Sequence, residues 1–401
     1  MSDTLPLNKI IVGSTLDVMR TWPSDSIHCV VTSPPYWGLR DYGVDEQIGL
    51  EATPEEFVAK MVEVFRDVRR VLRPDGVCWV NLGDSYNGSG GVGGDGKQHT
   101  NQGSVDRPDN RQGSPTLKPK DLVGIPWRVA LALQADGWYL RQDIIWHKPN
   151  PMPESVTDRC TKAHEYIFLL TKSARYYYDA EAVKEEQSEG TFERFGNGKA
   201  PRKTNPKSRT AETGTVLANA SYKDATPDSI MPDGKRNRRS VWTVPTAPYK
   251  GAHFATFPPA LIEPCILAGT SAEGCCPSCG TPWERVVEST KEWASGSGRS
   301  GNPINGKQDL SAAETNSTPD VRMGPVVSST TVGWQPICRC PRPQPKPVPC
   351  VVFDPFMGSG TVAEVARRNG CHYVGTELNP EYAKLCRKRL RQGTLLVTEA
   401  V

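Results

Sequence analysis

A glycine-rich turn near the end of the chain constrains the fold more than any other feature. Residues 351–354 form an apolar strand that ends in an acid, and residues 355–361 turn directly into a helical segment. A second strand follows and ends in the acid Glu377, about twenty positions after Gly358. A glycine turn between strand and helix lets the backbone approach a ligand, and an acid ending the next strand can bind both hydroxyls of a ribose. The stretch therefore predicts a nucleoside-binding site on a parallel sheet.

Elsewhere, apolar runs of strand length alternate with segments of helical periodicity. Thr53 and Glu56 form a capping box before an apolar stripe at helical spacing, which predicts a helix that ends before a turn at 74–76. The other expected elements are strands at 9–12, 27–31, 77–82, 139–146 and 165–171, a helix beginning near residue 16 and a helix at 126–135. Repetition of strand, helix and strand implies a doubly wound α/β sheet.

The strand at 27–31 leads into Thr32-Ser33-Pro34-Pro35-Tyr36. Successive prolines cannot continue a sheet ladder, so the strand ends there and leaves carbonyl oxygens pointing outward. Ser33 adds a hydroxyl and Tyr36 adds a flat aromatic face. Together these groups suit a planar ring with an exocyclic amino group, such as a nucleobase. The alternative is a turn that ends a strand, with Tyr36 packed on the core.

Residues 354–361 (DPFMGSGT) and 32–36 (TSPPY) together resemble the amino-methylating DNA methyltransferases. Those enzymes transfer a methyl group from S-adenosylmethionine to an exocyclic base nitrogen. The base-side motif comes first here, an order that resembles the permuted, β-type group. The resemblance covers about 8–180 and 241–392. It implies a Rossmann-like methyltransferase sheet with helices on both faces, S-adenosylmethionine as cofactor and double-stranded DNA as partner.

The resemblance also implies two sets of site residues. The cofactor-binding set is Asp354, Phe356, Gly358, Gly360, Thr361, Glu377, His253 and Phe254, with Glu377 on the ribose. The set that holds and stacks the target base is Ser33, Pro34, Pro35 and Tyr36. Apart from the resemblance, the aromatic Trp37 next to Tyr36 is a candidate to aid stacking. One position departs from the family, because Gly13-Ser14 stands where many members have Gly-Asp. No role is carried over to an acid at that position.

The implied reaction is a direct displacement at a sulfonium methyl, so the enzyme must hold nitrogen, carbon and sulfur in line. The base must leave the duplex to reach such a site. A serine before Pro-Pro-Tyr resembles the members that modify cytosine N4, whereas Asp or Asn is usual in those that modify adenine N6. Cytosine N4 is therefore the favoured target and adenine N6 the alternative. No cysteine follows Pro34-Pro35, which excludes the cytosine C5 class.

Two further alternatives belong to other functional classes. One is a catalytically inactive DNA-binding module of the same fold, and the other is a methyltransferase that acts on RNA or protein. The intact acids and glycines of residues 354–377 and the intact residues 33–36 favour an active enzyme on DNA. Restriction–modification, evasion of host defence and regulation are all roles that such an enzyme fills.

Cysteine spacing predicts a metal site. Cys276 and Cys279 form a C-x-x-C pair followed by glycine, and Cys338 and Cys340 form a second pair beyond a polar stretch. Four thiolates at this spacing are typical of a structural zinc ion, which would hold a small ribbon-like insertion together. Because the second pair has one intervening residue and not two, Cys275 could replace one ligand. Free cysteines and disulfides are the alternatives.

Residues 181–240 lose the alternating pattern and are rich in basic residues with aromatic ones between them. The basic residues are Arg194, Lys199, Arg202, Lys203, Lys207, Arg209, Lys235, Arg236, Arg238 and Arg239, and the aromatic ones are Phe192, Phe195 and Tyr222. Such a composition fits a surface that follows a phosphate backbone. The alternative is a solvated insertion with no partner.

The 401 residues are therefore expected to form five parts. These are the catalytic half of the methyltransferase domain (1–180), a basic target-recognition insertion (181–240), a cofactor-side segment (241–269), a zinc-ribbon-like insertion with a disordered loop (270–347) and the cofactor-binding half (348–401). The chain shows no apolar run of membrane-spanning length and no leader pattern, so we expect a soluble, cytoplasmic protein without membrane contact. The oligomeric state stays open, with a homodimer as one option.

Overall fold

A computed structural model of the chain describes residues 5–38, 43–44, 46–88, 114–186, 235–247, 257–293, 325–341 and 345–398. The chain divides into two compact units. The first unit consists of Met1–Val183, Arg239–Glu284 and Trp334–Val401, and the second consists of Lys184–Arg238 and Arg285–Gly333. Every motif singled out from the sequence, apart from the basic stretch, lies in the first unit.

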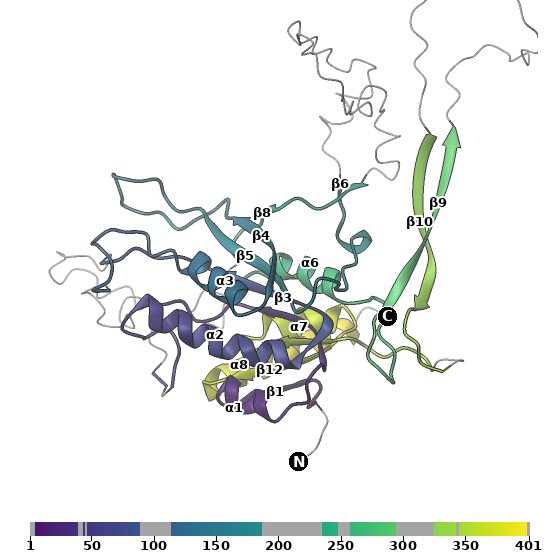
Figure 1. The fold of residues 1–401 in the computed structure, drawn as a ribbon, viewed down its shortest axis with the longest axis horizontal. Helices are drawn as coiled ribbons and strands as arrows, with labels where there is room; N and C mark the ends of the chain where they lie inside the picture. The colour runs from purple at the N-terminus through teal and green to yellow at the C-terminus, as the bar shows by residue number, and fades with distance from the viewer. Residues whose placement is uncertain are drawn as a thin grey trace, which may run out of the picture. The chain divides into compact units, whose positions relative to one another are not determined.

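The first unit is built on an eight-stranded sheet with the order β1-β12-β11-β2-β3-β5-β4-β8 (Figure 1). The strands are β1 (Lys9–Val12), β2 (Ile27–Thr32), β3 (Leu72–Leu82), β4 (Tyr139–His147), β5 (His164–Thr171), β8 (Val241–Thr243), β11 (Val351–Asp354) and β12 (His372–Glu377). Neighbouring strands are parallel except where β5 pairs with β3 and with β4.

The direction of winding reverses between β11 and β2. From β11 the chain passes through α7 (Thr361–Arg368) to β12 on one side, and from β2 it passes through α2 (Pro54–Val71) to β3 on the other. In open α/β sheets, ligands bind outside the carboxyl ends of the strands at such a switch point. The two strands that carry the candidate motifs are therefore the two that flank the switch point.

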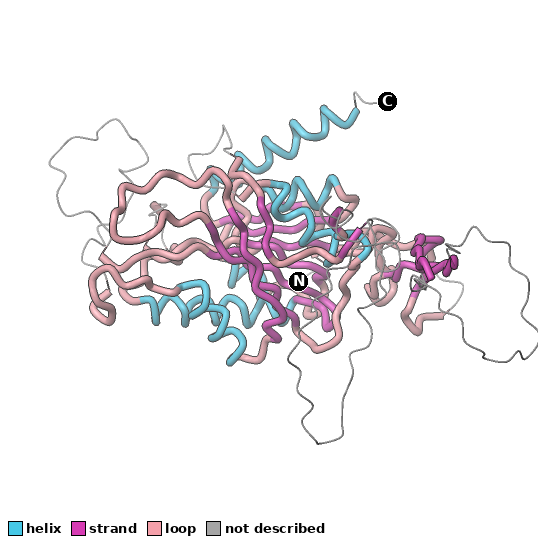
Figure 2. The backbone as a smooth tube through the Cα atoms, turned by 90° about the horizontal axis from the view of Figure 1, so that it is seen from above, coloured by secondary structure: helices cyan, strands magenta, loops and turns pink. Residues whose placement is uncertain are grey.

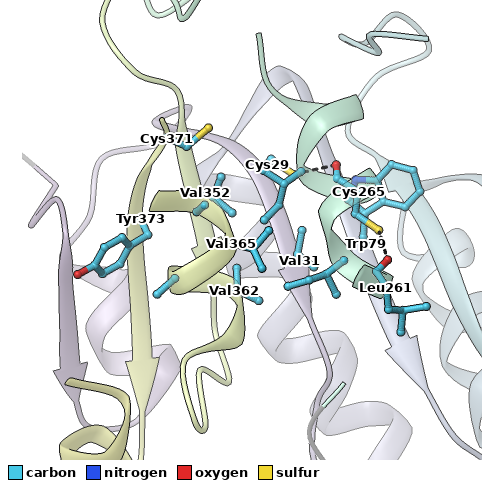
Figure 3. Close-up of a cluster of buried hydrophobic side chains, with 14 of the residues drawn as sticks. Cys29, Val31, Trp79, Leu261, Cys265, Val352, Val362, Val365, Cys371 and Tyr373 are labelled. Atoms are coloured by element: carbon cyan, nitrogen blue, oxygen red, sulfur yellow. Dashed lines mark hydrogen bonds between the residues drawn. The ribbon is translucent and has the colours of Figure 1, made fainter. Parts of the chain in front are cut away.

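Helices cover both faces of this sheet (Figure 2). Besides α2 and α7, the helices are α1 (Thr15–Arg20), α3 (Ile125–Ala135), α6 (Pro259–Gly269) and α8 (Pro380–Thr398). Buried side chains of α1, α2 and α3 pack with Val30, Cys78 and Phe353 in one cluster. Those of α6, α7 and α8 pack with Cys29 and Val31 in the other (Figure 3). Because successive strand residues face opposite sides, burial of both faces explains the continuous apolar runs. The predicted α/β sheet with helices on both faces is confirmed.

Three local features differ from the sequence prediction. The prediction omits α6, whose side chains are apolar almost all round and which contains Pro264, so it shows no amphipathic stripe. It also omits β8, which has only three residues. The turn expected at 74–76 lies inside β3, as an irregularity between the pairs Ile27 with Leu72 and Cys29 with Val77.

Smaller elements complete the described structure. They are a 3₁₀ turn, η2 (Glu181–Val183), a sheet of β6 (Glu185–Glu186) with β7 (Lys235–Arg236), and a sheet of β9 (Trp283–Trp293) with β10 (Pro325–Pro336). Arg236 of the basic stretch donates to Glu185 at 3.0 Å, so this cation stabilises the β6–β7 pair. The basic residues from Arg194 to Arg209 and the three aromatic ones lie outside the described residues. None of the helices within the described ranges has the length and apolar character needed to cross a bilayer.

Helix α6 approaches the sheet closely at Gly269. A Cβ atom there would lie 2.6 Å from Val77 Cγ2 and 2.7 Å from Cys29 Sγ. We expect Gly269→Ala to lower the free energy of unfolding by about 1–3 kcal/mol, because overpacking outweighs the helix propensity of alanine. Denaturant titration checks this, with Gly333→Ala as control, since a Cβ at Gly333 would meet nothing within 4 Å. Equal stability of the two variants would contradict the close approach.

Candidate active site

The base-side loop and the glycine loop begin side by side. Strands β2 and β11 pair in parallel, with Cys29 opposite Val352 and Val30 opposite Phe353. Their carboxyl ends therefore meet at one edge, where the Thr32 hydroxyl donates to Asp354 Oδ1 at 2.7 Å. Thr32 is 0% exposed and Asp354 is 1% exposed, so this hydrogen bond lies in the core. Residues 33–36 and 355–361 start directly beyond it.

Asp354 holds the first turn of the glycine loop as well. Its Oδ1 also accepts the Phe356 backbone N–H at 3.0 Å, so one carboxylate oxygen joins the end of β2 to the loop after β11. Burial raises the pKa of Asp354 to about 7; the bonds from Thr32 and Phe356 oppose this rise, and the nearby Glu377 adds to it. The geometry gives Asp354 the role of shaping the loop, because almost none of its surface is open to a ligand.

Glu377 ties the glycine loop to the end of the neighbouring strand β12. Its Oε2 accepts the Gly358 N–H at 2.7 Å, and its Oε1 accepts the Asn379 N–H at 2.8 Å. Burial raises the pKa of this carboxyl above its ordinary value. Each carboxylate oxygen carries two lone pairs, so both oxygens can accept a further hydrogen bond. Glu377 thus keeps acceptor capacity for a diol while it positions the loop.

Glycine is favoured at the two loop positions, 358 and 360, for different structural reasons. Both adopt left-handed backbone angles, with φ of +52° at Gly358 and +81° at Gly360. A Cβ at Gly360 would lie 2.1 Å from Cys386 Sγ of α8, whereas one at Gly358 would meet nothing closer than 3.9 Å. Thr361 is also turned toward α8, since its hydroxyl accepts from Arg389 Nη1 at 2.9 Å. Gly360 and Thr361 therefore serve helix packing, and Gly358 is the more open position.

On the base side, Tyr36 is held by its hydroxyl and by its ring. The hydroxyl donates to Glu165 Oε2 at 2.8 Å and lies 3.3 Å from Asn81 Oδ1. The ring lies so close to Gly83 that a Cβ there would come within 2.6 Å of its Cε2 atom. Ser33 and Tyr36 remain half-buried, while Pro34 is buried. The aromatic face is thus fixed beside the serine.

A polar network extends from Tyr36 to the next strands. Glu165 forms an ion pair with Lys148, and it accepts the Asn81 amide Nδ2–H at 3.2 Å. The Lys148 ammonium lies 4.3 Å from the centre of the Trp146 ring. The sequence prediction does not name Asn81 or Glu165 as site residues, and it assigns no individual role to Lys148, which lies in a segment (146–159) that resembles one near the active site of the family. The available signal is a polar residue at the end of an apolar strand, at Asn81 and again at Glu165.

Two expectations about the site need separate treatment. The prediction that Trp37 aids stacking is wrong, because this side chain is 7% exposed and packs in the core. Its indole N–H donates to the Glu51 carbonyl at 2.9 Å. His253 and Phe254 lie outside the described residues. The described part of that segment begins at Phe257, just before α6.

The four cysteines predicted as metal ligands gather in space. The Sγ atoms of Cys276, Cys279, Cys338 and Cys340 all lie within 4.8 Å of one another. Cys275 is not part of this group and lies instead with His28 and Cys350, whose ligand atoms are also mutually within 4.8 Å. The alternative in which Cys275 replaces a member of the first set is therefore not supported.

A family model described as DNA methylase, of the N6/N4 methyltransferase type, matches residues 27–276 and 350–388. The chain belongs to this family of DNA methylases. The methylase is 39% identical over 393 residues to the type II methyltransferase M.Cfr9I of Citrobacter freundii, covering 97% of this chain and 90% of that one. It is 37% identical over 384 residues to the type II methyltransferase M.SmaI of Serratia marcescens, with 95% and 90% covered.

A solved structure, the cytosine-N4-specific PvuII DNA methyltransferase, matches the methylase with a TM-score of 0.50 and 15% identity. The match covers 96% of this chain and 88% of that chain. At this level of identity the likeness concerns the fold.

The raised pKa of Asp354 predicts how stability depends on pH. Because the folded pKa of about 7 exceeds the ordinary value of 3.8, the proton on Asp354 favours folding at low pH, and this contribution is lost as the pH rises through 7. We therefore expect Asp354→Asn, which keeps the Oδ1 acceptor, to gain stability relative to the parent between about pH 4 and 7, by up to about 1.4 kcal/mol per unit.

Urea titrations of both proteins across that range measure the difference. Asp143→Asn, at an exposed position of β4, is the control. A difference between parent and Asp354→Asn that stays constant with pH would contradict the raised pKa.

Proposed function

We propose that the methylase transfers a methyl group from S-adenosylmethionine to the exocyclic amino group of a base flipped out of double-stranded DNA. The observation that carries this proposal is the 2.7 Å hydrogen bond between Thr32 and Asp354, which joins the base-side loop to the glycine loop at the switch point. The base-side strand β2 precedes the strand of the glycine loop in the chain. This order supports assignment to the permuted, β-type group.

The residues around the glycine loop fit S-adenosylmethionine. Glu377 has acceptor capacity for two ribose hydroxyls, and it stands at the carboxyl end of the strand next to the loop. The Glu377 carboxylate, which is partly exposed beside the loop, suits a ligand that carries hydroxyl groups. When bound, this cofactor supplies an electrophilic methyl group. Of the residues proposed for the cofactor site, Asp354, Gly360 and Thr361 shape the loop from behind, and Phe356, Gly358, Glu377, His253 and Phe254 are those proposed to face the cofactor.

Residues 33–36 supply the base side of the reaction. The exocyclic nitrogen of a base is a weak nucleophile, because its lone pair is delocalised into the ring. Hydrogen bonds from the amino group to the Pro34 carbonyl and the Ser33 hydroxyl favour a more tetrahedral nitrogen and direct its lone pair toward the methyl group. Stacking on Tyr36 offsets part of the few kcal/mol that flipping costs. The Glu165 and Asn81 contacts keep the Tyr36 ring in place for this.

Cytosine N4 is the proposed target within this reaction. Ser33 has a short hydroxyl side chain, whereas the carboxylate or amide of Asp or Asn would reach further toward the base. The space that residues 33–36 leave for the base therefore differs. Adenine N6 is the alternative target, and an inactive DNA-binding module is the alternative from another class. The near full-length relatives are type II methyltransferases, which supports a role in restriction–modification.

A structural zinc ion is proposed at Cys276, Cys279, Cys338 and Cys340. Four thiolates within 4.8 Å of one another match the donor set and the compactness of a tetrahedral zinc site. This zinc takes no part in methyl transfer. Metal analysis of the purified chain tests the site.

The role of Tyr36 is tested by a pair of substitutions. We expect Tyr36→Ala to lower methyl transfer by roughly 5- to 150-fold, since stacking a base on an aromatic ring is worth about 1–3 kcal/mol. Tyr36→Phe keeps the ring but loses the bond to Glu165, so its loss should be smaller. Cofactor affinity, measured by calorimetry, should stay close to that of the parent in both. Equal losses of transfer and cofactor binding would contradict a base-stacking role.

The substrate and the target atom are tested together with labelled S-adenosylmethionine. We expect label on duplex DNA and none on RNA or protein. Digestion of the DNA to nucleosides and mass analysis should give N4-methylcytosine. N6-methyladenine would establish the adenine alternative, and no label on any substrate would favour the inactive module.

A further inference from the structure

The cysteine cluster stands at the neck of a long insertion between α6 and β11. The chain departs from the first unit's core at Cys275 and returns at Val348, and these two residues pair through their backbones. Cys275 N–H donates to the Val348 carbonyl at 2.7 Å, and Val348 N–H donates to the Cys275 carbonyl at 2.9 Å. One cysteine pair follows the departure and the other precedes the return. The four sulfurs therefore meet where the two ends of the insertion come together.

Two side chains of the sheet hold the knuckle formed by residues 276–280. Arg73 of β3 donates through Nη1 to the Cys279 carbonyl at 2.7 Å, while its other nitrogens bind Asp75. His28 of β2 lies 2.7 Å through Nε2 from the Gly280 carbonyl. Gly280 has a φ of +71°, which favours glycine, and a Cβ there would come 2.5 Å from Arg73 Nη1 and displace the guanidinium. The knuckle is thus fastened to two neighbouring strands.

His28 also fastens the first residue of β11. Its Nδ1 lies 3.0 Å from the Val351 backbone N–H, which can only donate, so Nδ1 must be the acceptor. The ring proton therefore sits on Nε2 and is donated to the Gly280 carbonyl. His28 is 5% exposed, and both of its ring nitrogens are engaged in hydrogen bonds.

This assignment decides the nature of the second sulfur group. His28, Cys275 and Cys350 are near enough to one another to ligate a metal, but metal binding requires a free nitrogen lone pair. The Nδ1 lone pair is used by Val351 and Nε2 carries the proton. The group made of His28, Cys275 and Cys350 is therefore a hydrogen-bonded footing beneath the knuckle.

The footing lies at one end of the two strands that flank the switch point. The strands pair at two positions, Cys29 with Val352 and Val30 with Phe353. The His28 bond to Val351 joins their amino ends, and the Thr32 bond to Asp354 joins their carboxyl ends. A side-chain hydrogen bond thus joins the two strands at each end of their short pairing. The knuckle contacts the residue that makes the bond at the amino end, His28, through Gly280.

We propose that the four-cysteine cluster is a single metal clamp that closes the neck of the insertion and, through Gly280 and His28, braces the starts of β2 and β11. His28 is then a positioning residue for the active site at the far ends of these strands. This inference rests on the zinc site proposed above. Without the metal, the two cysteine pairs are no longer joined through their sulfurs, so the knuckle loses its link to the returning end of the insertion at Cys338 and Cys340.

Two substitutions of His28 separate its two bonds. His28→Gln places an amide nitrogen near the position of Nε2, so it keeps the bond to Gly280 and loses that to Val351. His28→Asn places an amide oxygen near the position of Nδ1, so it keeps the bond to Val351 and loses that to Gly280. The pair is matched, because each variant retains one of the contacts.

Release of zinc to a chelator from the full chain, without DNA or cofactor, tests the clamp. We expect release from His28→Asn to be about 10- to 100-fold faster than from the parent, the size of effect that outer contacts have on metal affinity. His28→Gln should stay within about threefold of the parent. Equal release from the two variants would overturn the role of the Gly280 bond.

Stoichiometry tests the assignment of the second group. The parent and Cys350→Ala should each hold about one zinc ion per chain, and Cys340→Ser should hold less than half of that. Two ions in the parent that fall to one in Cys350→Ala would overturn the assignment of the footing. No zinc in the parent would overturn the clamp itself.

Hydrogen exchange tests the bracing of the strands. On removal of zinc, amides of residues 27–32 and 351–354 should exchange faster, while those of β4, which lies three strands from β2, should keep their rates. Restored zinc should restore protection, and unchanged exchange would overturn the bracing. These measurements need no substrate, so a chain that follows all of them and transfers no methyl group contradicts the proposed function alone.

Discussion

The hydrogen bond from Thr32 to Asp354 is the interaction on which the arrangement of the candidate active site depends. It is buried, it joins strands whose motifs are 322 positions apart, and it stands where two loops leave the sheet. A hydrogen bond to a charged group contributes about 1.5–3 kcal/mol, but burying a carboxylate works against stability, as the pKa of about 7 shows. The charged form of Asp354 is therefore unfavourable in the core, but the hydrogen bond fixes the ends of β2 and β11, and so the starts of both loops, relative to each other. A displacement that needs three atoms in line requires such a shared origin.

Local signals in the sequence were enough to place most of the sheet. The Thr53 cap, for example, accepts the Glu56 N–H at 3.2 Å at the start of α2, and the glycine turn lies between β11 and α7 as its pattern indicates. Such features are decided by residues a few positions apart. Trp37 shows the limit of this reasoning, because it follows the base-side motif directly, and only its packing against α2 and the Glu51 carbonyl places it in the core.

The contacts that hold Tyr36 could not be predicted for the same physical reason. Asn81 and Glu165 meet because β3 and β5 pair antiparallel, with Asn81 opposite Ile167, and that register depends on the whole sheet. Gly360 illustrates a different ambiguity. A glycine is required there both by the left-handed turn and by the sulfur of Cys386, and a glycine pattern in a sequence does not distinguish approach to a ligand from approach to a helix.

The two ends of β2 and β11 contact different parts of the chain. The loops proposed to receive a base and a cofactor leave from the carboxyl ends, and the knuckle that opens the insertion contacts the amino ends. An insertion placed at the end away from the chemistry leaves the reacting groups undisturbed, yet its attachment acts on the same two strands. Because β2 has six residues and β11 has four, a displacement of their amino ends should also displace their carboxyl ends. His28 and Thr32 stand four positions apart on one strand, so the geometry of the site and the seat of the knuckle are set together.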